Sequence, residues 1–131
     1  GMDVSFSGIV TKAVNLIKSG EKIEDVCFSL QENCFAMLAE ISERALAHVG
    51  KKELLLIGGV AANKKLCEML NIMCSERGAK FFAVPIQYSG DQAAMIAWQG
   101  LLEYKPKTNL SIEEIDILPY ERTDEVKVTW E

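Results

Sequence analysis

Residues 54–66 read LLLIGGVAANKKL, in which four apolar residues are followed by a glycine pair and then by Asn63. The apolar run at 54–57 is too short and too uniform for a surface helix, so it predicts a strand buried on both faces. Gly58 and Gly59 stand where this strand must turn into a helix. Because glycine has no Cβ, a ligand can approach the backbone closely there, and we expect one that carries phosphate or sugar.

The elements around this stretch alternate between helices and apolar strands. Apolar residues spaced by threes and fours predict helices over residues 7–18, 23–49, 61–77 and 92–104. Residues 81–84 form a second apolar run, closed by Pro85, and predict a second buried strand. The order strand, helix, strand, helix is typical of a parallel sheet with right-handed crossovers, so we predict an α/β protein.

Composition suits one ordinary globular domain. The chain has 131 residues, of which 49% are hydrophobic and 25% charged. A chain of this length can bury a core without disulfides or structural metals. Neither a membrane-spanning run nor a signal-peptide pattern is found, so we expect a soluble, cytoplasmic protein without membrane contact. The net charge of -5 argues against nucleic-acid binding by this chain alone, because such binding depends on lysines and arginines.

Residues 107–131 lack the helical and strand patterns of the rest of the chain. They consist of short polar pieces and are expected to form an extended C-terminal tail of a single domain over residues 1–131. Val126, Val128 and Trp130 alternate with polar residues at its end. A period of two suits a half-buried edge strand or an extended segment laid on the domain.

The cysteines and the single histidine favour structural roles. Cys27 and Cys34 are seven residues apart within a helical pattern, and so are Cys67 and Cys74. This spacing lacks the close C-x-x-C pairs of zinc sites, so we expect buried, reduced thiols. His48 is expected at the end of a helix, where a cation complements the helix dipole.

The glycine pair and Asn63 have two interpretations of equal weight. In parallel α/β sheets ligands bind beyond the carboxyl ends of strands, where the asparagine amide could bond sugar hydroxyls, a ring nitrogen or phosphate. A tight strand-to-helix turn, with Asn63 near a cap, accounts for the same residues. Lys64 and Lys65 oppose the dipole of the helix, so they either balance a bound anion or point into water.

Two further polar groups precede predicted helices. Asp91 occupies the equivalent place after the second strand and could share one cleft with the glycine pair, holding a metal or positioning a nucleophile. Taken alone, Asp91 is better explained as a helix cap. Residues 3–8, DVSFSG, are explained adequately by capping and turn formation.

Four runs of the chain, read in order, resemble the C-terminal half of the catalytic subunit of the universal tRNA threonylcarbamoyladenosine synthase. They are GMDVSFSGIVTKAV, LLIGGVAANKKL, SGDQAAMIAWQGLL and RTDEVKVTW. The ending and the SFSG context are more similar to the archaeal and eukaryotic branch, which works in the KEOPS complex, than to bacterial TsaD. Together the four runs are highly specific and span most of the chain.

The resemblance implies a fold and an activity. The fold is the C-terminal lobe of an ATPase of the actin, hexokinase and heat-shock chaperone type (ribonuclease H-like), and the reaction transfers a threonylcarbamoyl group from its adenylate to N6 of the adenosine beside the tRNA anticodon. Asn63 would contact ATP or threonylcarbamoyl-adenylate, Gly58 and Gly59 would give the backbone approach, and Asp91 would bind a divalent metal, iron or zinc.

The sequence departs from the family pattern in two places. Gln92 stands where the family usually has asparagine, and the paired metal histidines of the family, H-x-x-x-H, lie in an upstream region that this sequence lacks. The chain therefore resembles one lobe that is inactive alone. The implied partners are the N-terminal lobe of the same enzyme, other KEOPS subunits including a small protein kinase, and tRNA through the complex.

Two rival functions are weighed against this one. The chain could be a non-catalytic nucleotide-binding or assembly module that docks other subunits. It could also be a metallopeptidase, a label this family once carried, but the H-E-x-x-H motif is missing from the sequence.

Overall fold

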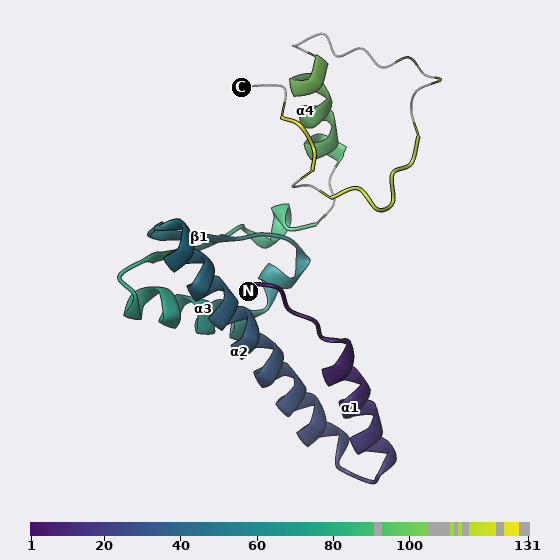
Figure 1. Cartoon of the computed structure of the whole chain (residues 1–131), viewed down its shortest axis with the longest axis vertical. Coiled ribbons are helices and arrows are strands. Elements are labelled where there is room, and N and C mark those ends of the chain that lie inside the picture. Colours follow the sequence, from purple (N-terminus) through teal and green to yellow (C-terminus); the bar gives the residue numbers. More distant parts are fainter. Residues whose placement is uncertain (91–92, 105–110, 112, 114–115, 123–124, 129–131) are drawn as a thin grey trace. The chain divides into compact units, whose positions relative to one another are not determined.

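The computed structural model describes residues 1–90, 93–104, 111, 113, 116–122 and 125–128. The chain divides into two compact units, residues 1–90 and 91–131, and each is described by itself. The elements of the first unit are α1 (Ser7–Lys18), α2 (Ile23–Val49), β1 (Glu53–Leu56), η1 (Gly59–Ala62), α3 (Lys64–Glu76), β2 (Lys80–Ala83) and η2 (Ile86–Tyr88), where η marks a 3-10 helix (Figure 1). A single domain over residues 1–131 stays a prediction.

β1 and β2 form a two-stranded parallel sheet, which confirms the predicted mixed α/β class. The register runs from Glu53 opposite Lys80 to Leu56 opposite Ala83. The Val84 N–H extends this ladder by donating to the Leu56 carbonyl at 3.0 Å. Because α3 carries the chain back to the start of the sheet, both strands end at the same edge.

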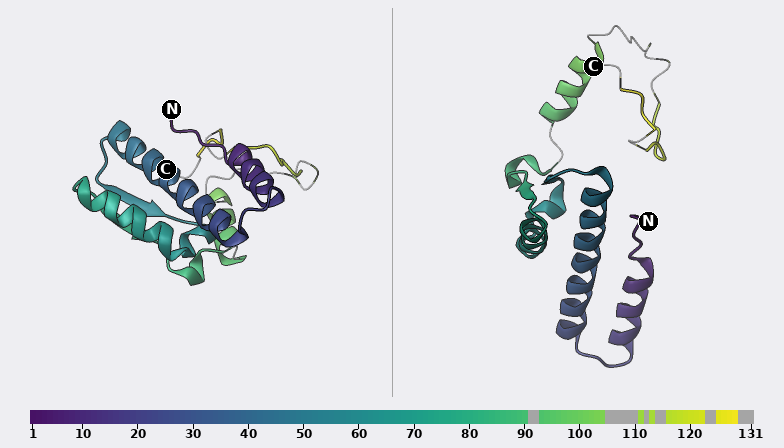
Figure 2. Two further views of the ribbon diagram at one scale, coloured as in Figure 1. Left: turned by 90° about the horizontal axis from the view of Figure 1, so that it is seen from below. Right: turned by 60° about the vertical axis from the view of Figure 1, so that its left-hand side comes forward.

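The core lies between the sheet and the helices α2 and α3. Leu54 and Leu56 of β1 and Phe81 of β2 pack against a buried cluster from the two helices, which consists of Leu46, Leu66, Leu70, Met73 and Cys74. Side chains on one strand alternate between faces, so α2 and α3 cover the same face of the sheet (Figure 2).

The other face of the sheet is open within residues 1–90. Leu55 and Phe82 are cross-strand partners on that face, and they are 60% and 47% exposed. Within residues 1–90 the sheet is therefore covered on one face only, and burial of the first strand on both faces stays a prediction for the whole chain. An apolar run indicates that both faces prefer burial, but it does not say which element covers each face.

The helix boundaries follow local sequence signals with one shift. α2 ends at Gly50, whose φ of +65° is the left-handed conformation of a helix C-cap. α1 packs beside the first half of α2 as an antiparallel hairpin (Figure 1). α3 begins at Lys64 rather than at residue 61, because residues 59–62 form η1 and Asn63 caps the helix that follows.

Two expectations for polar and sulfur side chains are corrected. The N-cap of α1 is Phe6 and has no side-chain hydrogen bond, while Ser5 and Ser7 bond each other, Oγ to Oγ at 3.0 Å, so the serines do not cap the helix. Of the four free thiols only Cys74 is buried, and Cys27 is exposed. Cys74, on α3, belongs to the core cluster, whereas Cys27, on α2, does not.

The second unit contains α4 (Ala93–Tyr104), whose side chains are largely apolar and exposed within the described residues. Residues 125–128 form a turn and a bend and no strand, so alternation at Val126 and Val128 does not produce an edge strand there. Trp130 lies outside the described residues. Among the helices that the structure describes, none combines the length and the apolar character needed to cross a bilayer.

Candidate functional site

The glycine turn lies at the edge where β1 ends. Gly58 has φ +87° and ψ 173°, a conformation that is essentially restricted to glycine. A Cβ added to Gly58 or Gly59 would meet nothing within 4 Å, and both residues are exposed. The backbone here is therefore open to an approaching molecule, and Gly58 is required by its dihedral angles.

Asn63 follows the turn and caps α3. Its Oδ1 accepts the Lys65 N–H at 3.0 Å and the Leu66 N–H at 3.2 Å. This geometry confirms the capping interpretation and leaves both hydrogens of Nδ2 available as donors. The N-terminus of α3 has fewer N–H groups to offer a phosphate, because the asparagine oxygen already accepts two of them.

A second turn follows β2 and packs beside the first. η2 contacts η1, as expected when parallel strands end at one edge. Ser89 closes this turn, is 8% exposed, and donates from Oγ to the Val84 and Pro85 carbonyls, each at 3.3 Å. Asp91, the expected metal ligand, lies outside the described residues, so its place beside Gly58 stays a prediction.

The structure adds a charged pair near Asn63 that sequence patterning missed. The Oε1 of Glu32, on α2, is buried and lies 3.6 Å from Lys65 Nζ. Glu32 is spaced three, seven and fourteen residues before Phe35, Ala39 and Leu46, which pack in or against the core. That helical spacing was the available signal, and it places the carboxylate on the face of α2 that meets α3.

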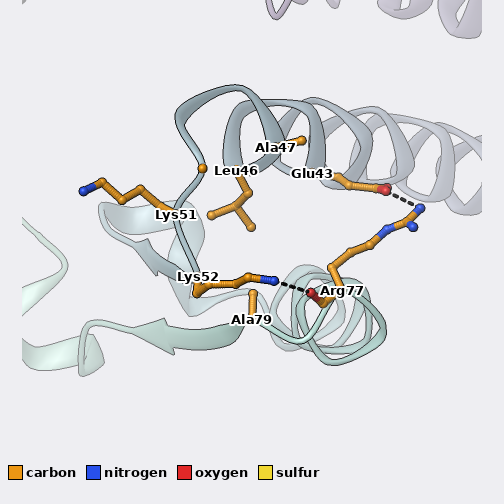
Figure 3. A pocket seen from close by; sticks show the side chains of 8 residues that line it. Glu43, Leu46, Ala47, Lys51, Lys52, Arg77 and Ala79 are labelled. Atoms are coloured by element: carbon orange, nitrogen blue, oxygen red, sulfur yellow. Dashed lines mark hydrogen bonds and ion pairs between the residues drawn. The ribbon is translucent and has the colours of Figure 1, made fainter.

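A hollow of about 400 Å³ lies at the opposite edge of the sheet, where the strands begin (Figure 3). Two of its three cations have structural partners: Lys52 Nζ donates to the Arg77 carbonyl at 3.4 Å, and Arg77 pairs with Glu43. Ligands of parallel α/β sheets bind at the carboxyl ends of strands, so this hollow is the weaker candidate.

The described residues by themselves do not fit a metal ion. Throughout the ranges that the structure describes, no three His, Cys, Asp or Glu side chains come together in a group that could hold one. A metal centre that used Asp91 would need further ligands from outside the described residues.

The first unit is thus an α/β structure in which a parallel strand ends in an open glycine turn, at the edge where ligands of such sheets bind. Residues 1–98 match the family model TsaD, described as tRNA N6-adenosine threonylcarbamoyltransferase. The chain belongs to this family, and the matched region includes both turns.

Relatives match the chain from end to end. A protein of Archaeoglobus fulgidus named "tRNA N6-adenosine threonylcarbamoyltransferase" is 53% identical over 131 residues, which are 100% of this chain and 41% of that protein. A Methanosarcina barkeri protein named "Probable bifunctional tRNA threonylcarbamoyladenosine biosynthesis protein" is 55% identical over 130 residues, which are 99% of this chain and 24% of the relative. The chain thus spans well under half the length of these curated relatives.

Proposed function

We propose that this chain supplies the nucleotide-holding residues of a tRNA N6-adenosine threonylcarbamoyltransferase. In this role it binds ATP or threonylcarbamoyl-adenylate while the threonylcarbamoyl group passes to N6 of the adenosine beside the tRNA anticodon. Family membership and identities of 53% and 55% to the relatives described above support this assignment.

The proposed architecture is the C-terminal lobe of an actin, hexokinase and heat-shock chaperone type of ATPase. Membership of the TsaD family supports it. Within residues 1–90 one face of the sheet is exposed at Leu55 and Phe82, so a further element is expected to cover it. An N-terminal lobe of the same enzyme would complete the cleft. This enzyme would act in the cytoplasm, in a complex with other KEOPS subunits that include a small protein kinase. The complex would bind tRNA.

The observation that carries the proposal is that the two polar atoms of the Asn63 amide have different roles. Its oxygen is used by the cap of α3, while its nitrogen is free to donate to a ribose hydroxyl, a ring nitrogen or a phosphate oxygen. The open backbone of Gly58 and Gly59 lets phosphate or sugar come close. Asp91 is proposed as a ligand of a divalent metal, iron or zinc, together with residues outside this chain.

Calorimetric titration of the chain with ATP tests the role of Asn63. In the Asn63→Ser variant the cap is retained, because serine is as good an N-cap as asparagine, and the amide donors are lost. We expect an unchanged free energy of unfolding and an ATP affinity lowered about three- to tenfold, the usual range for one hydrogen bond. Asn63→Ala serves as the control that loses both cap and donors.

Two outcomes would count against this site. If Asn63→Ser binds ATP as tightly as the wild-type chain, the amide does not contact the nucleotide. If the wild-type chain binds partner subunits but no ATP, the chain is an assembly module instead.

A further inference from the structure

Ion pairs join α3 to α2 at both ends of α3. Lys65 in the first turn pairs with Glu32, and Arg77, directly after the last turn, pairs with Glu43 (Figure 3). The carboxylates are 11 residues apart and the cations 12 residues apart, so both spans measure about 17 to 18 Å along a helix. The two helices therefore run parallel, with a charged contact at each end of their interface.

The pair at the start of α3 differs from its counterpart in its connection to Asn63. The backbone N–H of Lys65 donates to Asn63 Oδ1 at 3.0 Å, while its ammonium lies 3.6 Å from Glu32 Oε1. One residue thus links the cap of α3 to the middle of α2. Arg77 has no such link to the candidate site, because it lies at the far end of the same helix.

The Glu32 side chain is 32% exposed, but one of its oxygens is buried and depends on Lys65 for compensation of its charge. Oε1 of Glu32 is buried, and the described residues offer it no hydrogen-bond donor. The Lys65 ammonium is beyond normal hydrogen-bond distance but within ion-pair distance. Conversely, a cation in the first turn of a helix opposes the helix dipole, so Lys65 is itself favoured by the carboxylate. Each charge compensates an otherwise unfavourable position of the other.

We propose that Glu32 is a positioning residue of the nucleotide site: acting through Lys65, it fixes the first turn of α3 and so directs the Asn63 amide toward the ligand. The inference rests on the proposed function for its ligand. Glu32 itself touches no ligand. Its effect is to hold one orientation of the cap, so that binding does not have to order the amide.

Calorimetric ATP titration of matched variants tests the proposal. Glu32→Gln and Glu43→Gln each remove one carboxylate from the α2–α3 interface, and only the first lies at the Asn63 end. We expect Glu32→Gln to weaken ATP binding about fivefold, and Glu43→Gln to change it less than about twofold. Lys65→Arg keeps the pair and should retain affinity, whereas Lys65→Gln should lose it.

A second measurement reports on the cap without any ligand. Amide hydrogen exchange at Lys65 and Leu66, which donate to Asn63 Oδ1, should accelerate in Glu32→Gln and remain unchanged in Glu43→Gln. This readout judges the link between Glu32 and the cap even if the wild-type chain binds no ATP, an outcome that would overturn the proposed function alone.

Three results would overturn the inference. Equal losses of ATP affinity in Glu32→Gln and Glu43→Gln would mean that both pairs only stabilise the helix interface. Unchanged exchange at Lys65 and Leu66 in Glu32→Gln would mean that the pair does not hold the cap. Tighter ATP binding in Glu32→Gln would mean that Lys65, once released, binds phosphate directly.

Discussion

Gly58 is the position in the candidate site where the backbone conformation itself requires glycine. Its φ of +87° is unfavourable for any residue with a Cβ, whereas Gly59 next to it has no positive φ. The space around both residues is open, so any effect of an added methyl group on the free chain comes from the dihedral angles. The glycine pair is therefore a natural matched pair for mutation.

Gly58→Ala is expected to lower the free energy of unfolding by about 1–3 kcal/mol, the usual strain of such a conformation. Gly59→Ala should change it by less than about 0.5 kcal/mol, as at an unstrained surface position. Urea unfolding of the two variants measures both values. Equal losses in the two variants would contradict the assignment of strain to Gly58.

Cys74 gives the chain a pH-dependent contribution to stability. The side chain is 1% exposed, and burial raises the pKa of its thiol above the ordinary value of 9.0. In the unfolded chain the thiol ionises first, so the stability that depends on the neutral thiol is complete below pH 9 and is lost as pH rises further.

The difference in unfolding free energy between the wild-type chain and Cys74→Ala should therefore shrink as pH rises above about 9. Urea unfolding of the two proteins at a series of pH values measures it. A Cys74→Ala difference that is independent of pH would show that the thiol is not held neutral by the fold.

α3 is the element on which the core of the first unit depends. Leu66 and Leu70 are each 2% exposed, and they lie one turn apart on the face that meets α2 and the sheet. Ile72, on the same helix, is 50% exposed. The same class of side chain thus occupies two environments within one element.

Leu70→Ala is expected to destabilise the first unit by about 3 kcal/mol, because it leaves a cavity in the core. Ile72→Ala should cost less than about 1 kcal/mol, since half of that side chain is already in water. Thermal or urea unfolding followed by circular dichroism measures both. A larger loss for Ile72→Ala would contradict the described packing of α3.

Local features of this fold could be predicted from the sequence, and features that depend on a distant partner could not. The C-cap of α2 at Gly50 and the N-cap of α3 at Asn63 follow from neighbouring residues. The parallel order of the strands follows from the helix between them. The Glu32–Lys65 pair joins residues 33 positions apart, so helical periodicity alone did not reveal it. The element that covers the face beside Leu55 could not be predicted either, because strand composition does not indicate it.

At the scale of the whole molecule, the chain corresponds to 24% and 41% of the length of two relatives. The proposed activity therefore belongs to an assembly of which this chain is one part. A nucleotide held at the glycine turn of a single lobe remains in contact with water, whereas catalysis of group transfer generally needs a closed, preorganised site.

This chain alone is expected to form no threonylcarbamoyladenosine when it is mixed with tRNA and threonylcarbamoyl-adenylate. Nucleoside analysis of the digested tRNA by mass spectrometry measures the product. Addition of the N-terminal lobe as a separate polypeptide should restore formation, and Asn63→Ser should reduce the restored rate. Modified adenosine produced by the isolated chain would refute the single-lobe interpretation.

The uncovered side of the sheet has a consequence for the life of the polypeptide in a cell. Within residues 1–90, Leu55 and Phe82 form an exposed apolar pair, beside strand edges that can recruit other strands. Such surfaces attract chaperones, proteases and aggregation partners. A polypeptide in which this face stays uncovered is therefore expected to be degraded or to aggregate faster than one in which the face is covered.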